Sequence, residues 1–402
     1  MTLPSIAPFL PLCNVQASAV IEATSSNATT GVQCAAVDPA TGNVYIGGTF
    51  LKVNGVTRQG LACINRSGVL QSWNPGVSGS TYAASGVYAM VWVPGTGLYI
   101  SGSFTGVGGG TGTTAQTGVA LLNSAGAVLT WYPTAGFNYG SILCVDGSGN
   151  VYTGGGYGLS QISSSGVVSA WNTGITGPSG IQSACLLGGW LYLGGQITQG
   201  NLTAVTTQAF TGVCRVNLAT GYCDTWAPSI AYSASPGNEN VVSLAADTSG
   251  NLYLAGNFTS VLGSTQKGFA SIAPAGPTLN SWAPAPTHTG YGWRVAANGT
   301  DIYWTSQYAT ATGGSVKEAG CMSAAGTDLA WDPWVAGPQG GSTTSLPPIN
   351  GFVFDPSNPV VPAVYAFGYF GNVLYGGALG PITRYQLAKF ADRTFSPTHL
   401  AY

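Results

Sequence analysis

One unit recurs seven times along the chain, and this repetition constrains the fold more than any other feature. In the clearest copy, an apolar run at 241–247 leads through a Thr-Ser-Gly-Asn turn into a second run at 252–258. A third run at 268–272 follows, and Trp282 closes the copy. A tyrosine in the second run marks every copy, at Tyr45, Tyr99, Tyr152, Tyr192, Tyr253, Tyr303 and Tyr365. Such self-similarity indicates a solenoid, a propeller or another repeat array.

A closing aromatic residue accompanies the tyrosine in each copy. It stands at Trp73, Trp131, Trp171, Trp226, Trp282 and Trp331, with Phe395 in the seventh copy. Each copy holds four short apolar-alternating runs separated by glycine turns, which is the content of one propeller blade. A helical solenoid would need a 3.6-residue period that is absent here. The sequence therefore predicts an all-β, seven-bladed β-propeller with four antiparallel strands per blade.

The composition agrees with many short strands joined by tight turns. The chain holds 61 glycines in 402 residues, 11% aromatic residues and only 5% charged residues. Disordered chains are poor in aromatic residues and usually rich in charge, so disorder is excluded. Glycine supplies the turns, and β-branched and aromatic residues supply the strands.

Finer motifs surround the tyrosine of the first copy. Tyr45 is followed by Gly48-Thr49-Phe50, then by Asn54-Gly55 and an apolar strand at 61–65. These residues resemble the delta-60 type of β-propeller repeat found in bacterial and phage proteins. The resemblance covers roughly residues 32 to 397. It implies a propeller and little chemistry, because the functions of that family are mostly unassigned.

The repeat divides the chain into three predicted regions. Residues 1–31 form a proline-containing arm, 32–397 the propeller, and 398–402 a short tail. In one interpretation, 17–23 adds an outer strand to blade seven and latches the ring; in the other, the arm docks on a neighbouring subunit. The first residues lack the basic region of a signal peptide. The sequence contains no run of 18 apolar residues, so it predicts no membrane span.

The lengths of the connections differ between the two ends of the predicted blades. Turns from first to second and from third to fourth strand are short, whereas the other connections are long. The long ones cover 105–117, 198–211, 227–239, 283–292 and 332–349. Long loops on a rigid scaffold commonly carry binding sites, so this long-loop face is the predicted functional face. The alternative is that these insertions are tolerated without a role.

Aromatic residues in or near these loops are the candidate ligand-binding residues. They are Tyr82, Phe137, Tyr139, Tyr232, Tyr291 and Trp293. Such rings can stack on sugars or anchor a protein partner. The alternative for each is that it covers the end of the apolar core.

Residues suited to catalysis are scarce. The two histidines are His288 and His399, and glutamate occurs only at Glu22, Glu239 and Glu318. General acid–base or nucleophilic catalysis needs such groups held together. Three aspartates precede glycine-containing turns, where hydrogen bonds to the backbone explain them: Asp38, Asp146 and Asp247. We therefore predict no enzyme activity, no catalytic residues, no metal site and no cofactor.

The eight cysteines predict free thiols for the most part. Cys144, Cys185 and Cys214 take positions that hold alanine in other copies, so they fit small buried sites. Cys214 and Cys223 flank one hairpin, and a disulfide between them is left open. Zinc-binding spacing is absent.

A net charge of −2 with scattered basic residues argues against a nucleic-acid partner. The resemblance to repeats of bacterial and phage proteins, together with low charge, a Gly/Ser/Thr/Asn surface and the proline-containing arm, implies a bacteriophage virion component: a decoration, fibre or receptor-binding subunit. It would be made in the host cytoplasm and displayed on the virion surface, contacting other virion subunits through 1–31. Its long-loop face would contact a partner or a host glycan. The alternative is an extracellular or cell-surface bacterial adhesion propeller that binds carbohydrate.

Overall fold

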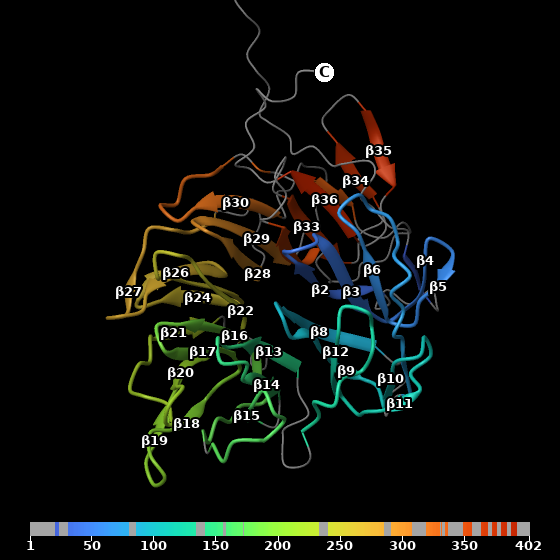
Figure 1. The fold of residues 1–402 in the computed structure, drawn as a ribbon. Coiled ribbons are helices and arrows are strands. Elements are labelled where there is room, and N and C mark those ends of the chain that lie inside the picture. Colours follow the sequence, from blue (N-terminus) through green and yellow to red (C-terminus); the bar gives the residue numbers. More distant parts are fainter. Residues whose placement is uncertain are drawn as a thin grey trace, which may run out of the picture.

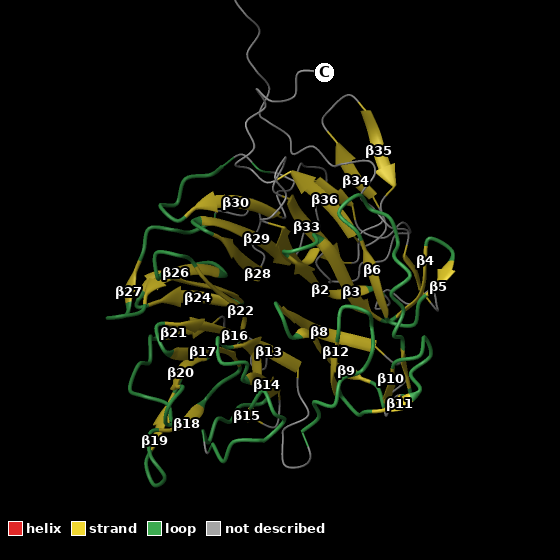
Figure 2. Ribbon diagram, in the orientation of Figure 1, coloured by secondary structure: helices red, strands yellow, loops and turns green. Residues whose placement is uncertain are grey.

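The computed structural model is built of β-strands joined by turns and loops, and the residues it describes contain no helix (Figures 1 and 2). This confirms the predicted all-β class. The described residues are 21–23, 31–79, 86–133, 141–155, 158–171, 173–232, 240–284, 291–307, 319–329, 331, 334–336, 349–355, 363–368, 372–375, 379–383 and 387–391.

Each repeat contributes one antiparallel sheet in which its first, second and third strands lie in chain order. The first strands are β2 (Val32–Asp38), β8 (Gly86–Val93), β13 (Ser141–Val145), β16 (Ile181–Leu187), β22 (Val241–Ala246), β28 (Tyr291–Asn298) and β32 (Ile349–Asp355). The second strands are β3 (Asn43–Gly48), β9 (Gly97–Ser103), β14 (Val151–Gly155), β17 (Trp190–Gly195), β23 (Leu252–Gly256), β29 (Asp301–Gln307) and β33 (Ala363–Gly368). The third strands are β6 (Leu61–Ile64), β12 (Val119–Leu122), β15 (Gly158–Ile162), β20 (Val213–Asn217), β26 (Phe269–Ala273), β30 (Ala319–Ser323) and β36 (Leu387–Ala391).

The fourth strand is much reduced in the described residues. In the fifth repeat it is β27 (Thr278–Leu279), paired with β26. Elsewhere single bridges hold the fourth position, at Ile64–Leu70, Leu122–Val128, Ile162–Val168, Val216–Cys223 and Met322–Asp328. The predicted fourth run thus pairs with the third strand over one or two residues.

Most of the long connections form small sheets of their own, which corrects their description as loops. In each, a strand that precedes a repeat pairs with a hairpin between that repeat's second and third strands. The three-stranded examples are β1 (Ile21–Ala23) with β4 (Phe50–Val53) and β5 (Val56–Thr57); β7 (Val77–Ser78) with β10 (Gly106–Val107) and β11 (Thr114–Ala115); β21 (Ile230–Tyr232) with β24 (Phe258–Val261) and β25 (Ser264–Thr265); and β31 (Trp334–Ala336) with β34 (Asn372–Tyr375) and β35 (Leu379–Thr383). In the fourth repeat, the hairpin of β18 (Gln199–Asn201) and β19 (Thr207–Ala209) is joined to Thr176 by a single bridge.

The described part of the arm also pairs with a hairpin of the repeat that follows it. Strand β1 pairs antiparallel with β4, so Ile21–Ala23 lies against the first repeat. This differs from the proposed latch, in which 17–23 would add an outer strand to blade seven. Residues 1–20 and the tail 398–402 lie outside the described residues.

The seven first strands succeed one another around a common centre (Figure 1). Each contacts the first strand of the next repeat, from β2 and β8 through to β28 and β32. Strand β2 also contacts β32, so the first repeat lies beside the last.

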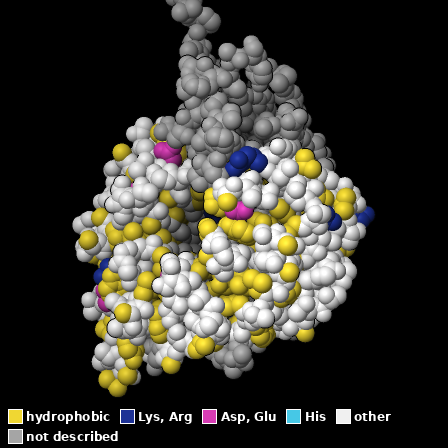
Figure 3. Space-filling model, in the orientation of Figure 1, with side chains coloured by type: hydrophobic (Ala, Val, Ile, Leu, Met, Phe, Trp, Pro, Cys, Tyr) yellow, Lys and Arg dark blue, Asp and Glu magenta, His cyan; other side chains and the backbone are white. Residues whose placement is uncertain are grey.

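Charged side chains are few and scattered on the face drawn in Figure 3. Arg215 and Asp224 pair within the fourth repeat, and Arg66 of the first repeat pairs with Asp355 of the seventh. The rest of the structure therefore depends mainly on apolar packing.

A tyrosine–tryptophan contact is the common feature of that packing. In six repeats the second-strand tyrosine lies against the closing tryptophan of the same repeat, with ring centroids 4.8–5.7 Å apart. Most of these pairs are edge-to-face, a favoured aromatic geometry. The seventh partner, Phe395, lies outside the described residues.

The tryptophan also reaches the next repeat. The indole nitrogen of Trp131 donates a hydrogen bond to the backbone oxygen of Ser163, at the turn after the third strand of repeat three, over 2.9 Å. A Cβ on Gly126, at the equivalent turn of repeat two, would lie 3.1 Å from the indole nitrogen of Trp73. Each pair is therefore a joint between one repeat and the next.

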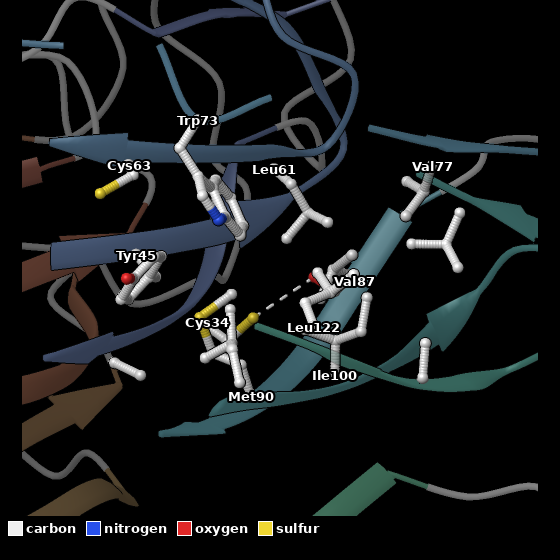
Figure 4. Packing of buried hydrophobic residues seen from close by; sticks show 14 of the residues in the cluster. Cys34, Tyr45, Leu61, Cys63, Trp73, Val77, Val87, Met90, Ile100 and Leu122 are labelled. Atoms are coloured by element: carbon white, nitrogen blue, oxygen red, sulfur yellow. Dashed lines mark hydrogen bonds between the residues drawn. The ribbon is translucent and has the colours of Figure 1, made fainter. Parts of the chain in front are cut away.

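The apolar core consists of separate clusters at the boundaries between repeats. Figure 4 shows one cluster, in which Tyr45 and Trp73 of repeat one pack with Val87, Ile100 and Leu122 of repeat two. The other clusters are likewise shared by successive repeats, and one of them joins the seventh repeat to the first.

An aspartate holds the turn between first and second strands. Asp146 Oδ1 accepts the backbone N–H groups of Ser148 and Asn150, and Oδ2 accepts the Tyr152 hydroxyl, each over 2.9 Å. Burial alone raises the pKa of Asp146, but these bonds and the Asn150 amide outweigh it, so the pKa is lowered. The predicted turn role is confirmed for three aspartates, Asp38, Asp146 and Asp247.

Cysteines in the described residues carry free thiols, Cys214 and Cys223 included. Cys63, Cys214 and Cys223 are buried within apolar clusters. Burial, reinforced by the charge of Asp38, raises the pKa of Cys63 to about 12. Burial, together with a hydrogen bond to Cys223, raises the pKa of Cys214 well above its ordinary value.

Replacing Trp282 by alanine should lower the free energy of unfolding by about 3–5 kcal/mol, because truncating a buried aromatic residue leaves a cavity. Trp282 is 0% exposed and lies 4.8 Å from Tyr253. Trp171→Ala is the matched control and should cost less, since Trp171 is half-buried and lies 5.7 Å from Tyr152 in a tilted geometry. Urea unfolding followed by circular dichroism measures both. An equal or greater loss in Trp171→Ala would contradict the role assigned to this joint.

The thiols should resist alkylation while the chain is folded. At pH 8, iodoacetamide should leave Cys63 and Cys214 unmodified, because burial keeps them protonated and inaccessible. The same reagent should modify both after unfolding in urea without reductant. Peptide mass spectrometry gives the extent at each position. Failure of Cys214 and Cys223 to react in urea would show that they form a disulfide.

Candidate binding site on the inner strands

Every first strand carries a β-bulge, and in six of the seven repeats it lies at the same place, opposite the residues two and three positions after the second-strand tyrosine; in β13 it lies two residues further along. In each, one residue near the start of the strand has no partner on the second strand, and the register shifts around it. The seven bulge residues are Gln33, Tyr88, Leu143, Gln182, Val242, Trp293 and Asn350. Bulges re-aim side chains and often lie beside functional sites.

A glycine of the second strand allows the close backbone approach beside the bulge. A Cβ on Gly48 would collide with the backbone oxygen of Gly31, just before the first strand. The sixth repeat has Ser306 in place of this glycine, and Ser306 pairs with Gly292 of the first strand. Gly292 allows a different close approach, since a Cβ there would collide with the backbone oxygen of Gly268 in repeat five.

The bulge residues are more exposed than the residues before them. Tyr88 is 39% exposed and Gln182 is also exposed, whereas Gln33, Trp293 and Asn350 are half-buried. The preceding residue is buried in the described cases, Val32, Val87, Ile181, Val241, Gly292 and Ile349. Because the first strands surround the centre of the molecule (Figure 1), the bulge residues stand around that centre near the starts of these strands.

The bulges lie near the starts of the first strands, at the end of the sheets from which the longer connections emerge. The ring of Tyr88 folds back over Gly86, where a Cβ would come within 3.0 Å of Tyr88 Cε1. Glycine at this position therefore leaves room for the tyrosine ring over the start of its own strand.

Four bulge residues from neighbouring strands form one continuous arc. Strand β28 contacts β32, β32 contacts β2, and β2 contacts β8. The arc, in spatial order, is Trp293, Asn350, Gln33 and Tyr88. We call these four residues the inner arc. It places two amide side chains between two aromatic ones, and it exists only because the last repeat lies beside the first.

Arg294 holds one end of the inner arc. Its guanidinium carbon lies 4.6 Å from the centroid of the Trp293 ring. Its Nε donates a hydrogen bond to the backbone oxygen of Asn350 over 3.1 Å, and its Nη1 donates to the backbone oxygen of Trp293 over 2.9 Å. This cation thus supports the Trp293 ring and ties β28 to β32.

The structure places the predicted aromatic residues in different environments. Tyr291 and Trp293 lie on β28, and Trp293 belongs to the inner arc. Tyr232 is half-buried against a core cluster, and its hydroxyl donates to the backbone oxygen of Thr211 over 3.2 Å, so it covers the core. Tyr82, Phe137 and Tyr139 lie outside the described residues.

Three members of the inner arc were not predicted from the sequence as binding residues: Gln33, Tyr88 and Asn350. They lie in predicted strands rather than in loops. Their signal was an aligned position at which the residue type varies widely while the residue before it stays apolar or is glycine.

No three metal-ligating side chains come together within the described part of the chain. Within that same part, no helix long and apolar enough to cross a bilayer is present.

No protein-family model and no curated protein sequence matches the chain. Its structure is similar to the extracellular domain of BT4673, a proposed hybrid two component system from B. thetaiotaomicron, with TM-score 0.52, 13% identity, and coverage of 93% of this chain and 39% of that one. It is similar to streptogramin B lyase, with TM-score 0.50, 10% identity and coverage of 93% and 97%. The Dos1 propeller gives TM-score 0.49, 10% identity and coverage of 94% of both chains.

With successive sheets arranged around a common centre and a likeness to streptogramin B lyase over 93% of the chain, the chain has a β-propeller fold. Identities of 10–13% bear on the fold alone, and a fold does not determine a function. What the propeller binds has to be argued from its own residues.

Proposed function

We propose that the chain forms a closed propeller of seven blades, one for each repeat, of the delta-60 type. Support comes from the seven core clusters, each shared by neighbouring repeats, and from the cluster that joins repeats seven and one. The ion pair between Arg66 and Asp355 crosses the same junction, with Nε–Oδ2 2.8 Å and Nη2–Oδ1 3.2 Å. Closure removes sheet edges that would otherwise invite aggregation.

Arg66→Ala tests this closure. Asp355 is 0% exposed, so losing its counter-charge should cost about 1–3 kcal/mol. We expect a lower melting temperature and faster hydrogen exchange in β2 and β32. Arg215→Ala, which breaks the Arg215–Asp224 pair, is the matched control; it should speed exchange near β17 and β20 and around Pro274 of repeat five, to whose backbone oxygen Arg215 donates, but not in β2 or β32. Unchanged exchange in β32 of Arg66→Ala would contradict the proposed junction.

We further propose that the protein is a non-enzymatic surface component of a bacteriophage particle that contacts a host glycan or a partner. The inner arc carries this proposal. It presents aromatic and amide side chains without an acid, a base or a nucleophile, which suits recognition rather than catalysis. The few exposed charges and the resemblance of the repeats to those of phage proteins support the same assignment.

Purified particles from the source of this sequence should contain the chain as a stoichiometric component. Gradient-purified phage, analysed by mass spectrometry, should retain it through washing in high salt, because an apolar, weakly charged contact is little screened. The host lysate before phage assembly is the control. Recovery only from the host cell surface, with none in particles, would support the bacterial adhesion protein instead and overturn the virion proposal.

A further inference from the structure

We propose that the inner arc is a saccharide site that takes one neutral pyranose unit between Trp293 and Tyr88. This inference rests on the proposed recognition of a host glycan and names the ligand class and the residues that bind it. The site is composite, since its four residues come from four different repeats.

The aromatic residues suit the apolar face of a sugar. Both ends of the arc are aromatic, and Tyr88 is the more exposed, at 39%. A pyranose ring presents a flat patch of C–H groups that can lie on an aromatic face and shed water. Burying such surface is favourable and needs no charge on either partner.

The two amides between the aromatic residues suit the hydroxyl groups. Gln33 and Asn350 are half-buried on adjacent strands. A side-chain amide offers an acceptor oxygen and two donor hydrogens, which matches hydroxyl groups that both donate and accept. A few placed polar groups among apolar ones are typical of small-molecule sites.

The arc selects for neutral rather than acidic sugars. Its four side chains carry no formal charge, and the cation nearest to them in sequence is Arg294. That guanidinium stacks on Trp293 and donates to the backbone oxygens of Asn350 and Trp293. Binding an acidic sugar would require it to leave these contacts.

The arc is held in place before any ligand arrives. Each of its residues is fixed at a bulge within a paired strand. Trp293 is further held by Arg294, and the Tyr88 ring lies over Gly86. These two aromatic side chains would then lose little freedom on binding, which favours affinity.

The opposite side of the centre provides a matched control. Gln182 and Val242 occupy bulges on β16 and β22, away from the inner arc. Gln182 is an exposed amide, so Gln182→Ala removes the same chemical group as Gln33→Ala at an equivalent position.

Saturation-transfer NMR on the purified full chain tests the proposal. The probes are the methyl glycosides of glucose, galactose, mannose, N-acetylglucosamine and rhamnose, with sialyllactose as the acidic comparison. We expect saturable binding of at least one neutral probe. Trp293→Ala and Tyr88→Ala should each weaken it about tenfold or more, and Gln33→Ala measurably, whereas Gln182→Ala should leave it unchanged. Melting temperatures show that each variant is folded.

Three results would overturn the inference: no saturable binding of any neutral probe, binding that Gln182→Ala weakens as much as Gln33→Ala does, or binding of sialyllactose alone. These outcomes are separate from the particle test. A chain that binds sugars but is absent from particles retains the saccharide site and loses the virion role. A chain found in particles without sugar binding shows the reverse.

Discussion

The edge-to-face contact between a second-strand tyrosine and the closing tryptophan of its repeat is the interaction on which the rest of the structure depends. It buries two large rings where one repeat meets the next, as with Tyr253 and Trp282, both 0% exposed. Because burial of apolar area supplies most of the stabilisation, the chain needs little charge; only 5% of its residues are charged.

This arrangement links the fold to the candidate site. The bulge near the start of each first strand leaves one residue without a partner on the second strand, and in most repeats a glycine opposite permits the backbone to come close, as Gly48 does beside Gly31. The core therefore needs the glycine, whereas the bulge side chain is free to vary. The inner arc, with Gln33 and Asn350 side by side at its middle, arises only where repeats one and seven meet.

Much of the fold could be predicted from the sequence because its signals are periodic. The tyrosines and tryptophans marked the joints, and Asp146 and Asp247 were read correctly as turn residues. The small outer sheets could not be foreseen, since strands of two residues such as β5 and β11 are too short to show alternation. The arc was missed for another reason: it is assembled from residues far apart in the chain, and a bulge leaves no mark in a single copy of the repeat.

An experimental structure of the purified chain, by crystallography or electron cryo-microscopy, tests the central claim most directly. The decisive region is the junction of the first and last repeats. The account predicts β2 packed between β8 and β32, with Arg66 paired to Asp355 across the junction. Density in which β2 and β32 are separated, or in which the repeats form an open array, would contradict it.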